Sequence, residues 1–263
     1  MNLNERFEVS EQQKEFYKRN KFIKLKQVFN EEILRYYEKE ITAEVNRINS
    51  QPVPLEERDT YGKAFLQIFN LWLENNEIKD FVLSKRLGGI AADLMEVDRV
   101  RIYHDQALFK EGGGGITPWH ADQYYWPLDT SKTITAWIPL QETPLEMGPL
   151  EFAAGSDKIE EGRDLNISDD SERRIEKNLR INNFKHVIEA FDLGEVSFHS
   201  GWVFHRAGAN KTDRTRKVMT VIFMDAETRL MAPKNENQKL DWERWCPGAK
   251  VGRVIDSPLN PVI

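Results

Sequence analysis

The chain has 263 residues, 40% hydrophobic and 30% charged, which is typical of a globular protein with a substantial core. Its net charge of −6 argues against a nucleic-acid binder and against binding to an anionic membrane, because both surfaces attract mainly positive charge. Cys246 is the only cysteine, and the chain shows neither an apolar leader nor an apolar run that could span a bilayer, so a cytoplasmic protein is predicted.

The first part of the chain, residues 1–97, is predicted to be mostly helical. Ser10 and Asn30 suit helix N-caps, and the segment after Asn30 carries apolar residues at helical spacing. The short apolar segment 22–25, between the two expected helices, is typical of a strand. Further helices are expected between residues 64 and 96.

Two interruptions are expected within this helical region. The polar, proline-containing stretch 49–62 is predicted to be a loop. The adjacent glycines Gly88 and Gly89 are predicted to break a helix, because glycine is a poor helix former.

From residue 98 the pattern changes to short strand-like segments separated by turn formers. The segments rich in strand-forming residues are 100–109, 116–122, 133–140, 149–154 and two more after residue 190. Regular spacing of this kind is typical of a sandwich or jelly roll. We therefore predict a mainly β fold with flanking helices, its strands lying within 98–156 and 190–230.

The interval 157–189 is highly charged and shows little strand pattern. Its middle has opposite charges three and four residues apart, which is typical of a solvated helix. Two interpretations remain open: a surface insertion, or a lid over a pocket. Since no repeat or low-complexity linker divides the chain, residues 1–263 are predicted to form a single domain.

A candidate metal site is found in the triplet His120-Ala121-Asp122. In an extended strand, residues two apart project from the same face, so the imidazole and the carboxylate could reach one ion. His205, in a later strand-rich segment, is the expected third ligand. Two histidines and one carboxylate leave three positions open on iron, as non-haem oxygenases require.

An isolated H-x-D triplet is common by chance, so the prediction also depends on Arg216, eleven residues after His205. Its planar guanidinium can hold a carboxylate through two charge-assisted hydrogen bonds. Arg214 has the same chemistry but falls in an expected turn. His199 is the rival third ligand, although no matching asparagine and arginine follow it.

The remaining histidines fit a metal site less well. His104 and Asp105 are adjacent, so in a strand they point to opposite faces and cannot readily share an ion. His186 falls in the charged interval and is expected to be solvated.

The sequence resembles the phytanoyl-CoA dioxygenase family, a branch of the double-stranded β-helix oxygenases with a cupin-like jelly roll and a helical N-terminal region. The resemblance is carried by TPWHADQYYWP, TITAWIPL, MGPLEFAAGS and the H-x₄-N-x₅-R pattern at 205–216. The MGPLEFAAGS turn departs from the family pattern, because Ala154 replaces a proline and Asp157 replaces a histidine. Neither change touches an expected ligand.

This resemblance implies Fe(II) as the metal, 2-oxoglutarate as cosubstrate and O₂ as oxidant. It implies that His120, Asp122 and His205 hold the iron and that Arg216 binds the distal carboxylate of 2-oxoglutarate. Gln106 matches the position of a cosubstrate contact, with exposure to solvent as its alternative. Trp137 matches a tryptophan that borders the same pocket, with a plain core role as its alternative.

The implied reaction is hydroxylation of an unactivated C–H bond, with release of succinate and CO₂. Because Asp122 is present, hydroxylation is expected rather than halogenation; desaturation, cyclisation and epoxidation use the same ferryl chemistry and stay open. Aromatic residues near the ligands favour a partly apolar small-molecule substrate, and no basic cluster suits coenzyme A. The alternatives are a non-catalytic cupin-like metal-binding module, which has no need of Arg216, and an oxygenase acting on a macromolecule. Oligomeric state is not predicted.

Overall fold

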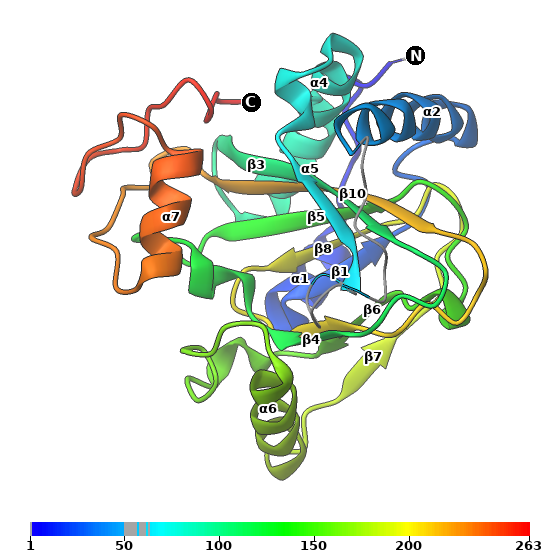
Figure 1. Ribbon diagram of the computed structural model, residues 1–263. Coiled ribbons are helices and arrows are strands. Elements are labelled where there is room, and N and C mark those ends of the chain that lie inside the picture. Colours follow the sequence, from blue (N-terminus) through cyan, green and yellow to red (C-terminus); the bar gives the residue numbers. More distant parts are fainter. Residues whose placement is uncertain (1, 50–56, 58–61, 63) are drawn as a thin grey trace.

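The computed structural model describes residues 2–49, 57, 62 and 64–263. It consists of two antiparallel sheets packed face to face, with helices on the outside (Figure 1). The predicted loop at 49–62 lies almost entirely outside the described residues. None of the helices in the described ranges is long and apolar enough to cross a membrane.

The larger sheet has six strands in the order β1-β8-β5-β10-β3-β2. Strands distant in sequence are neighbours in it, as in a jelly roll; β10, for example, pairs with β3 on one side and β5 on the other. In chain order the strands are β1 Phe22–Leu25, β2 Leu66–Phe69, β3 Val100–Lys110, β5 Thr133–Pro139, β8 Val196–Ser200 and β10 Arg216–Asp225.

The smaller sheet has four strands in the order β4-β9-β6-β7. They are β4 Thr117–His120, β6 Leu150–Ala153, β7 His186–Ile188 and β9 His205–Ala207. These strands are short, and the paired strands β4 and β9 carry the two histidines expected to bind metal. The predicted jelly-roll fold with a helical N-terminal region is therefore confirmed.

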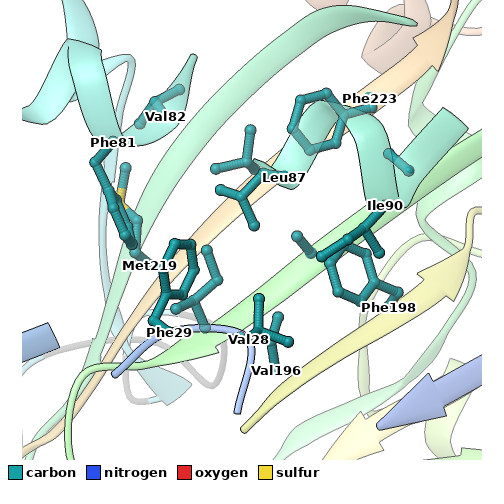
Figure 2. Packing of buried hydrophobic residues seen from close by; sticks show 14 of the residues in the cluster. Val28, Phe29, Phe81, Val82, Leu87, Ile90, Val196, Phe198, Met219 and Phe223 are labelled. Atoms are coloured by element: carbon teal, nitrogen blue, oxygen red, sulfur yellow. The ribbon is translucent and has the colours of Figure 1, made fainter. Parts of the chain in front are cut away.

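The N-terminal helices cover the outer face of the larger sheet (Figure 1). The helices in this region are α1 Glu11–Asn20, α2 Glu31–Ile48, α4 Asn76–Val82 and α5 Lys85–Met95. Ser10 and Asn30 cap α1 and α2 through bonds to backbone N–H groups, as expected. Figure 2 shows Phe81 of α4 beside Met219 of β10 and Leu87 of α5 near Phe223 of β10, so the helices pack on the outer face of the sheet and the opposite face is left for the site.

The structure corrects two predictions in the helical region. Residues 66–69 form strand β2 at the edge of the larger sheet, because they pair with β3. Gly88 and Gly89 do not break a helix; both lie within α5. A Cβ at Gly88 would lie 2.6 Å from Cγ2 of Ile263, so this glycine lets the end of the chain pack closely on α5.

The charged interval 157–189 contains helix α6, Asp169–Ile181, and then strand β7. Helix α6 is fixed to the outside of the smaller sheet by polar contacts. Arg206 pairs with Glu151 (2.8 Å) and Glu172 (2.7 Å), and the Trp119 indole donates to Glu176 (2.7 Å). The choice between insertion and lid stays a prediction.

Helix α7, Glu236–Trp245, lies near the C-terminus, in a region for which the sequence analysis predicted no helix. It lies beside one end of the two sheets (Figure 1). Residues Leu71–Leu73, Asp122–Tyr125, Leu145–Met147 and Ser156–Lys158 form short 3-10 turns between the main elements.

Candidate metal centre

His120, Asp122 and His205 lie together between the two sheets. His120 ends β4 and is the register partner of His205 on β9, so strand pairing brings the two rings side by side. Asp122 Oδ1 lies 3.5 Å from His120 Nε2 and 3.6 Å from His205 Nε2. The three potential ligand atoms all lie within 4.8 Å of one another.

The backbone that presents Asp122 differs from the expected strand. Strand β4 ends at His120, and Asp122 is the first residue of a 3-10 turn. Ala121 between them is extended, with φ −122° and ψ 126°. Because that single residue keeps the strand conformation, His120 and Asp122 still project to the same side.

Both histidine rings are held with Nε2 free for a metal. The Nδ1 atom of His120 lies 2.7 Å from the carbonyl oxygen of Pro118, and that of His205 lies 3.1 Å from the carbonyl oxygen of Val203. A carbonyl can only accept, so Nδ1 carries the proton and Nε2 the lone pair. Hydrogen bonds of this kind orient metal-binding histidines. Burial, followed by the nearby His120, holds the pKa of His205 well below its usual value, so the ring is neutral.

The second oxygen of Asp122 is fixed by two hydrogen bonds. Oδ2 accepts from the Thr135 hydroxyl at 3.0 Å and lies 3.3 Å from His199 Nε2. His199, the rival ligand, therefore contacts the carboxylate and lies outside the three-residue group.

Arg216, at the start of β10, faces the same cavity and is almost completely buried. One guanidinium nitrogen donates to the carbonyl oxygen of Gly148, and the guanidinium lies 5.4 Å from the Trp137 ring. Among the described residues Nε has no hydrogen-bond partner and no carboxylate is within ion-pair distance. Burial lowers the pKa of Arg216 to about 9. A guanidinium that is buried without a carboxylate partner is stabilised when an anion binds to it from outside the protein.

Lys110, the register partner of Arg216 across β3 and β10, is also buried. Its side-chain nitrogen donates to the carbonyl oxygens of Gly115 (2.6 Å) and Gly208 (2.8 Å). Burial, with a further effect of Arg216, lowers the pKa of Lys110 to about 6. The buried Arg216 guanidinium therefore makes this end of the cavity suited to a carboxylate group.

The two less specific cosubstrate candidates also line the cavity. Gln106 lies on β3, and its side-chain oxygen accepts a hydrogen bond from Gln67. Trp137 on β5 packs in the core between the sheets and borders the cavity. Arg214 lies exposed in the turn before β10, as expected.

Two other histidine predictions have different outcomes. His104 faces the cavity while the Asp105 carboxylate accepts from the backbone N–H groups of Leu71 (2.9 Å) and Trp72 (3.2 Å), so the two side chains do not share a site. The prediction that His186 is solvated was wrong. It is half-buried in β7, and its Nδ1 lies 3.0 Å from a Glu151 oxygen.

The cavity has a volume of about 160 Å³. At about 30 Å³ for each water, this corresponds to about five waters. The cavity is lined by Tyr125, one of the aromatic residues near the expected ligands, and by residues that the sequence analysis did not single out: Phe69, Ile167, Asp241, Arg244 and Trp245. Only tertiary structure brings these distant segments together.

Comparison with family models places residues 2–218 in a match to phytanoyl-CoA dioxygenase (PhyH). A search of curated proteins found no match. Among solved structures, the chain is similar to SnoK, a non-heme alpha ketoglutarate dependent carbocyclase from nogalamycin biosynthesis. The identity is 23%, with 97% of this chain and 96% of SnoK covered, and the TM-score is 0.79.

Two further structures have the same fold. The epimerase SnoN, in complex with Fe3+, alpha ketoglutarate and nogalamycin RO, is 20% identical, with 96% and 97% of the two chains covered and a TM-score of 0.77. EctD from S. alaskensis, with 2-oxoglutarate and 5-hydroxyectoine, is 16% identical, with 98% and 91% covered and a TM-score of 0.71. At these identities the likeness shows the fold.

Proposed function

Because the chain belongs to the phytanoyl-CoA dioxygenase family of iron- and 2-oxoglutarate-dependent oxygenases, we propose that it hydroxylates an unactivated C–H bond of a small molecule. His120, Asp122 and His205 hold the iron, and Arg216 holds the distal carboxylate of 2-oxoglutarate. Gln106 and Trp137 border the cosubstrate. The products are succinate, CO₂ and the hydroxylated substrate, with one oxygen atom of O₂ in each of the two organic products.

The observation that supports this proposal most is the pairing of the metal group with Arg216 in one cavity. A metal-binding module needs only the two histidines and the aspartate. It has no use for a buried guanidinium that has no counter-ion among the described residues, because burying such a charge is costly. A dicarboxylate that also binds the metal accounts for both features.

The residues have separable tasks in the proposed reaction. When bound, the iron and 2-oxoglutarate supply the oxidant through oxidative decarboxylation. The carbonyl oxygens of Pro118 and Val203 fix the histidine tautomers, while Thr135 and His199 hold Oδ2 of Asp122 and leave Oδ1 directed to the histidines. Buried side chains such as His120, His205 and Trp137 reduce the access of water to this part of the cavity.

The cofactor part of the proposal can be tested without a known substrate. Anaerobic addition of 2-oxoglutarate to the Fe(II)-loaded protein should produce a weak visible charge-transfer band, and the Arg216→Met variant should need far more 2-oxoglutarate to do so. Normal iron binding without any band would contradict the proposal and favour the metal-binding module.

The reaction outcome is tested by product analysis. Succinate formation would be measured across a panel of small molecules, and the product of any active compound would be identified by mass spectrometry under ¹⁸O₂. Gain of one labelled oxygen supports hydroxylation. Because the similar structures include a carbocyclase and an epimerase, loss of two hydrogens or an isomer of unchanged mass would instead assign another outcome to this site.

A further inference from the structure

The cavity also contains charged residues that have no role in binding the iron or 2-oxoglutarate. The cavity is lined by four charged residues, of which Asp122 and Arg216 are assigned to the iron and to 2-oxoglutarate. The other two, Asp241 and Arg244, both come from α7, which lies beyond the part of the chain that matches the family. This wall is therefore suited to determine what this particular chain binds.

Aromatic rings surround this part of the cavity. The His104 ring lies 5.5 Å from the Phe69 ring and 5.0 Å from the Trp245 ring, and Phe69 and Trp245 are 4.8 Å apart. Trp126 lines the cavity next to them. Burial lowers the pKa of His104 to about 4, so this ring is neutral at physiological pH and adds no positive charge.

The Asp241 carboxyl borders these rings, and it forms no ion pair with a described lysine or arginine. Its contacts are with the Tyr103 hydroxyl, which donates to Oδ2 at 3.4 Å, and with the Trp245 indole. No lysine or arginine among the described residues is within ion-pair distance of it; Arg244, one turn further along α7, is exposed. Burial raises the pKa of Asp241 to about 7, although the hydrogen bonds from Trp245 and Tyr103, and then the more distant charge of Arg244, counteract this.

We propose that Asp241, Phe69, His104 and Trp245 form a subsite for a protonated amine, so that the substrate is a small organic amine with an apolar or aromatic body. The inference rests on the proposed function, because it assigns the substrate side of the same cavity. Aromatic faces attract cations, and a carboxylate supplies the matching charge-assisted hydrogen bond. Binding of the amine supplies the counter-ion that Asp241 does not have within the described structure.

The test is calorimetric binding of three matched probes to the full chain, with Fe(II) and 2-oxoglutarate under anaerobic conditions and again without them. Phenethylamine carries the ammonium group, 2-phenylethanol is its neutral counterpart, and phenylalanine adds a carboxylate that could pair with Arg244. Since removing one partner of a buried charge pair costs at least about 2 kcal/mol, phenethylamine should bind at least about thirtyfold more tightly than 2-phenylethanol.

Two α7 variants make the test specific. Asp241→Asn, which preserves shape, should remove the preference for the amine. Glu243→Gln removes the same charge from an exposed position of the same helix and should leave the preference intact. Equal or tighter binding of the alcohol, no binding of either amine, or a preference that survives Asp241→Asn would overturn the proposal.

The binding results with and without cofactors also distinguish a failure of the amine subsite from a failure of the proposed function. An amine preference in the cofactor-free protein supports the subsite even if no charge-transfer band forms, whereas a normal band without an amine preference overturns the subsite alone. Tighter binding of phenylalanine, lost in Arg244→Gln, supports the proposal with an amino acid as substrate. Weaker binding of phenylalanine than of phenethylamine supports it with a simple amine.

Discussion

Replacing Arg216 with methionine should weaken 2-oxoglutarate binding without destabilising the ligand-free protein. Burial lowers the pKa of Arg216 to about 9, whereas that of an ordinary arginine exceeds 12. At about 1.4 kcal/mol for each tenfold change, burying this charge costs roughly 4–5 kcal/mol. Because a lowered pKa disfavours the charged form in the folded state, this cost is present at all pH values below about 9, including neutral pH.

The variant loses some favourable contacts as well. The hydrogen bond to Gly148 contributes about 1.5–3 kcal/mol, and the contact with Trp137 about 1–2 kcal/mol. These losses offset most of the relieved burial cost, so the free energy of unfolding of the ligand-free protein should change by less than about 2 kcal/mol. The dissociation constant for 2-oxoglutarate should rise by about thirty- to several thousand-fold, corresponding to about 2–5 kcal/mol.

The assay combines anaerobic calorimetry of 2-oxoglutarate binding to the Fe(II) protein with urea unfolding of the ligand-free protein. Arg214→Met removes an exposed guanidinium two residues away and is the matched control; it should change neither quantity. Unchanged 2-oxoglutarate affinity in Arg216→Met, together with a loss of stability above about 3 kcal/mol, would show that Arg216 has a structural role and refute the reasoning.

Four further substitutions have defined outcomes. Asp122→Ala should abolish succinate formation and weaken Fe(II) binding in an anaerobic titration; full activity would remove Asp122 from the iron site. Thr135→Val deletes the 3.0 Å bond to Asp122 while preserving shape, and should lower iron affinity about ten- to hundredfold; unchanged affinity would show that Asp122 needs no such support. Gly88→Ala should lower the free energy of unfolding by about 1–3 kcal/mol, because the new Cβ would lie 2.6 Å from Ile263. Gly89→Ala in the same helix meets nothing within 4 Å and should raise it by up to about 1 kcal/mol, and equal effects of the two glycine changes in urea unfolding would contradict the packing argument.

The parts of the fold that could be predicted from sequence are those with a local pattern. Helix α2 follows a good N-cap and a 3.6-residue periodicity, and β3 and β10 are long strands of suitable residues. Strand β2 could not be recognised in the same way, because its four residues are a strand only through pairing with β3. Gly88 misled the prediction since its role depends on Ile263, 175 positions later in the chain.

The candidate site also has parts that follow from a local pattern and parts that depend on tertiary structure. The proximity of His120 and Asp122 follows from one extended residue, Ala121, so a local argument finds it even though the strand ends earlier than expected. The group also includes His205, which is brought to His120 by strand pairing that the sequence alone does not specify. The amine subsite depends on α7 folding back over the cavity, and no short motif encodes that arrangement.

The proposed ligands are divided between the two sheets, so their binding of iron and 2-oxoglutarate affects the stability of the folded protein. His120 and His205 belong to the smaller sheet, whereas Arg216 belongs to the larger one. Iron and 2-oxoglutarate bound together would therefore link the two layers from inside, and a ligand present at a hundredfold excess over its dissociation constant adds about 2.7 kcal/mol to the stability of the folded state. Iron starvation would then shorten the lifetime of the protein as well as stop its catalysis, so that its abundance follows the metabolic state of the cell.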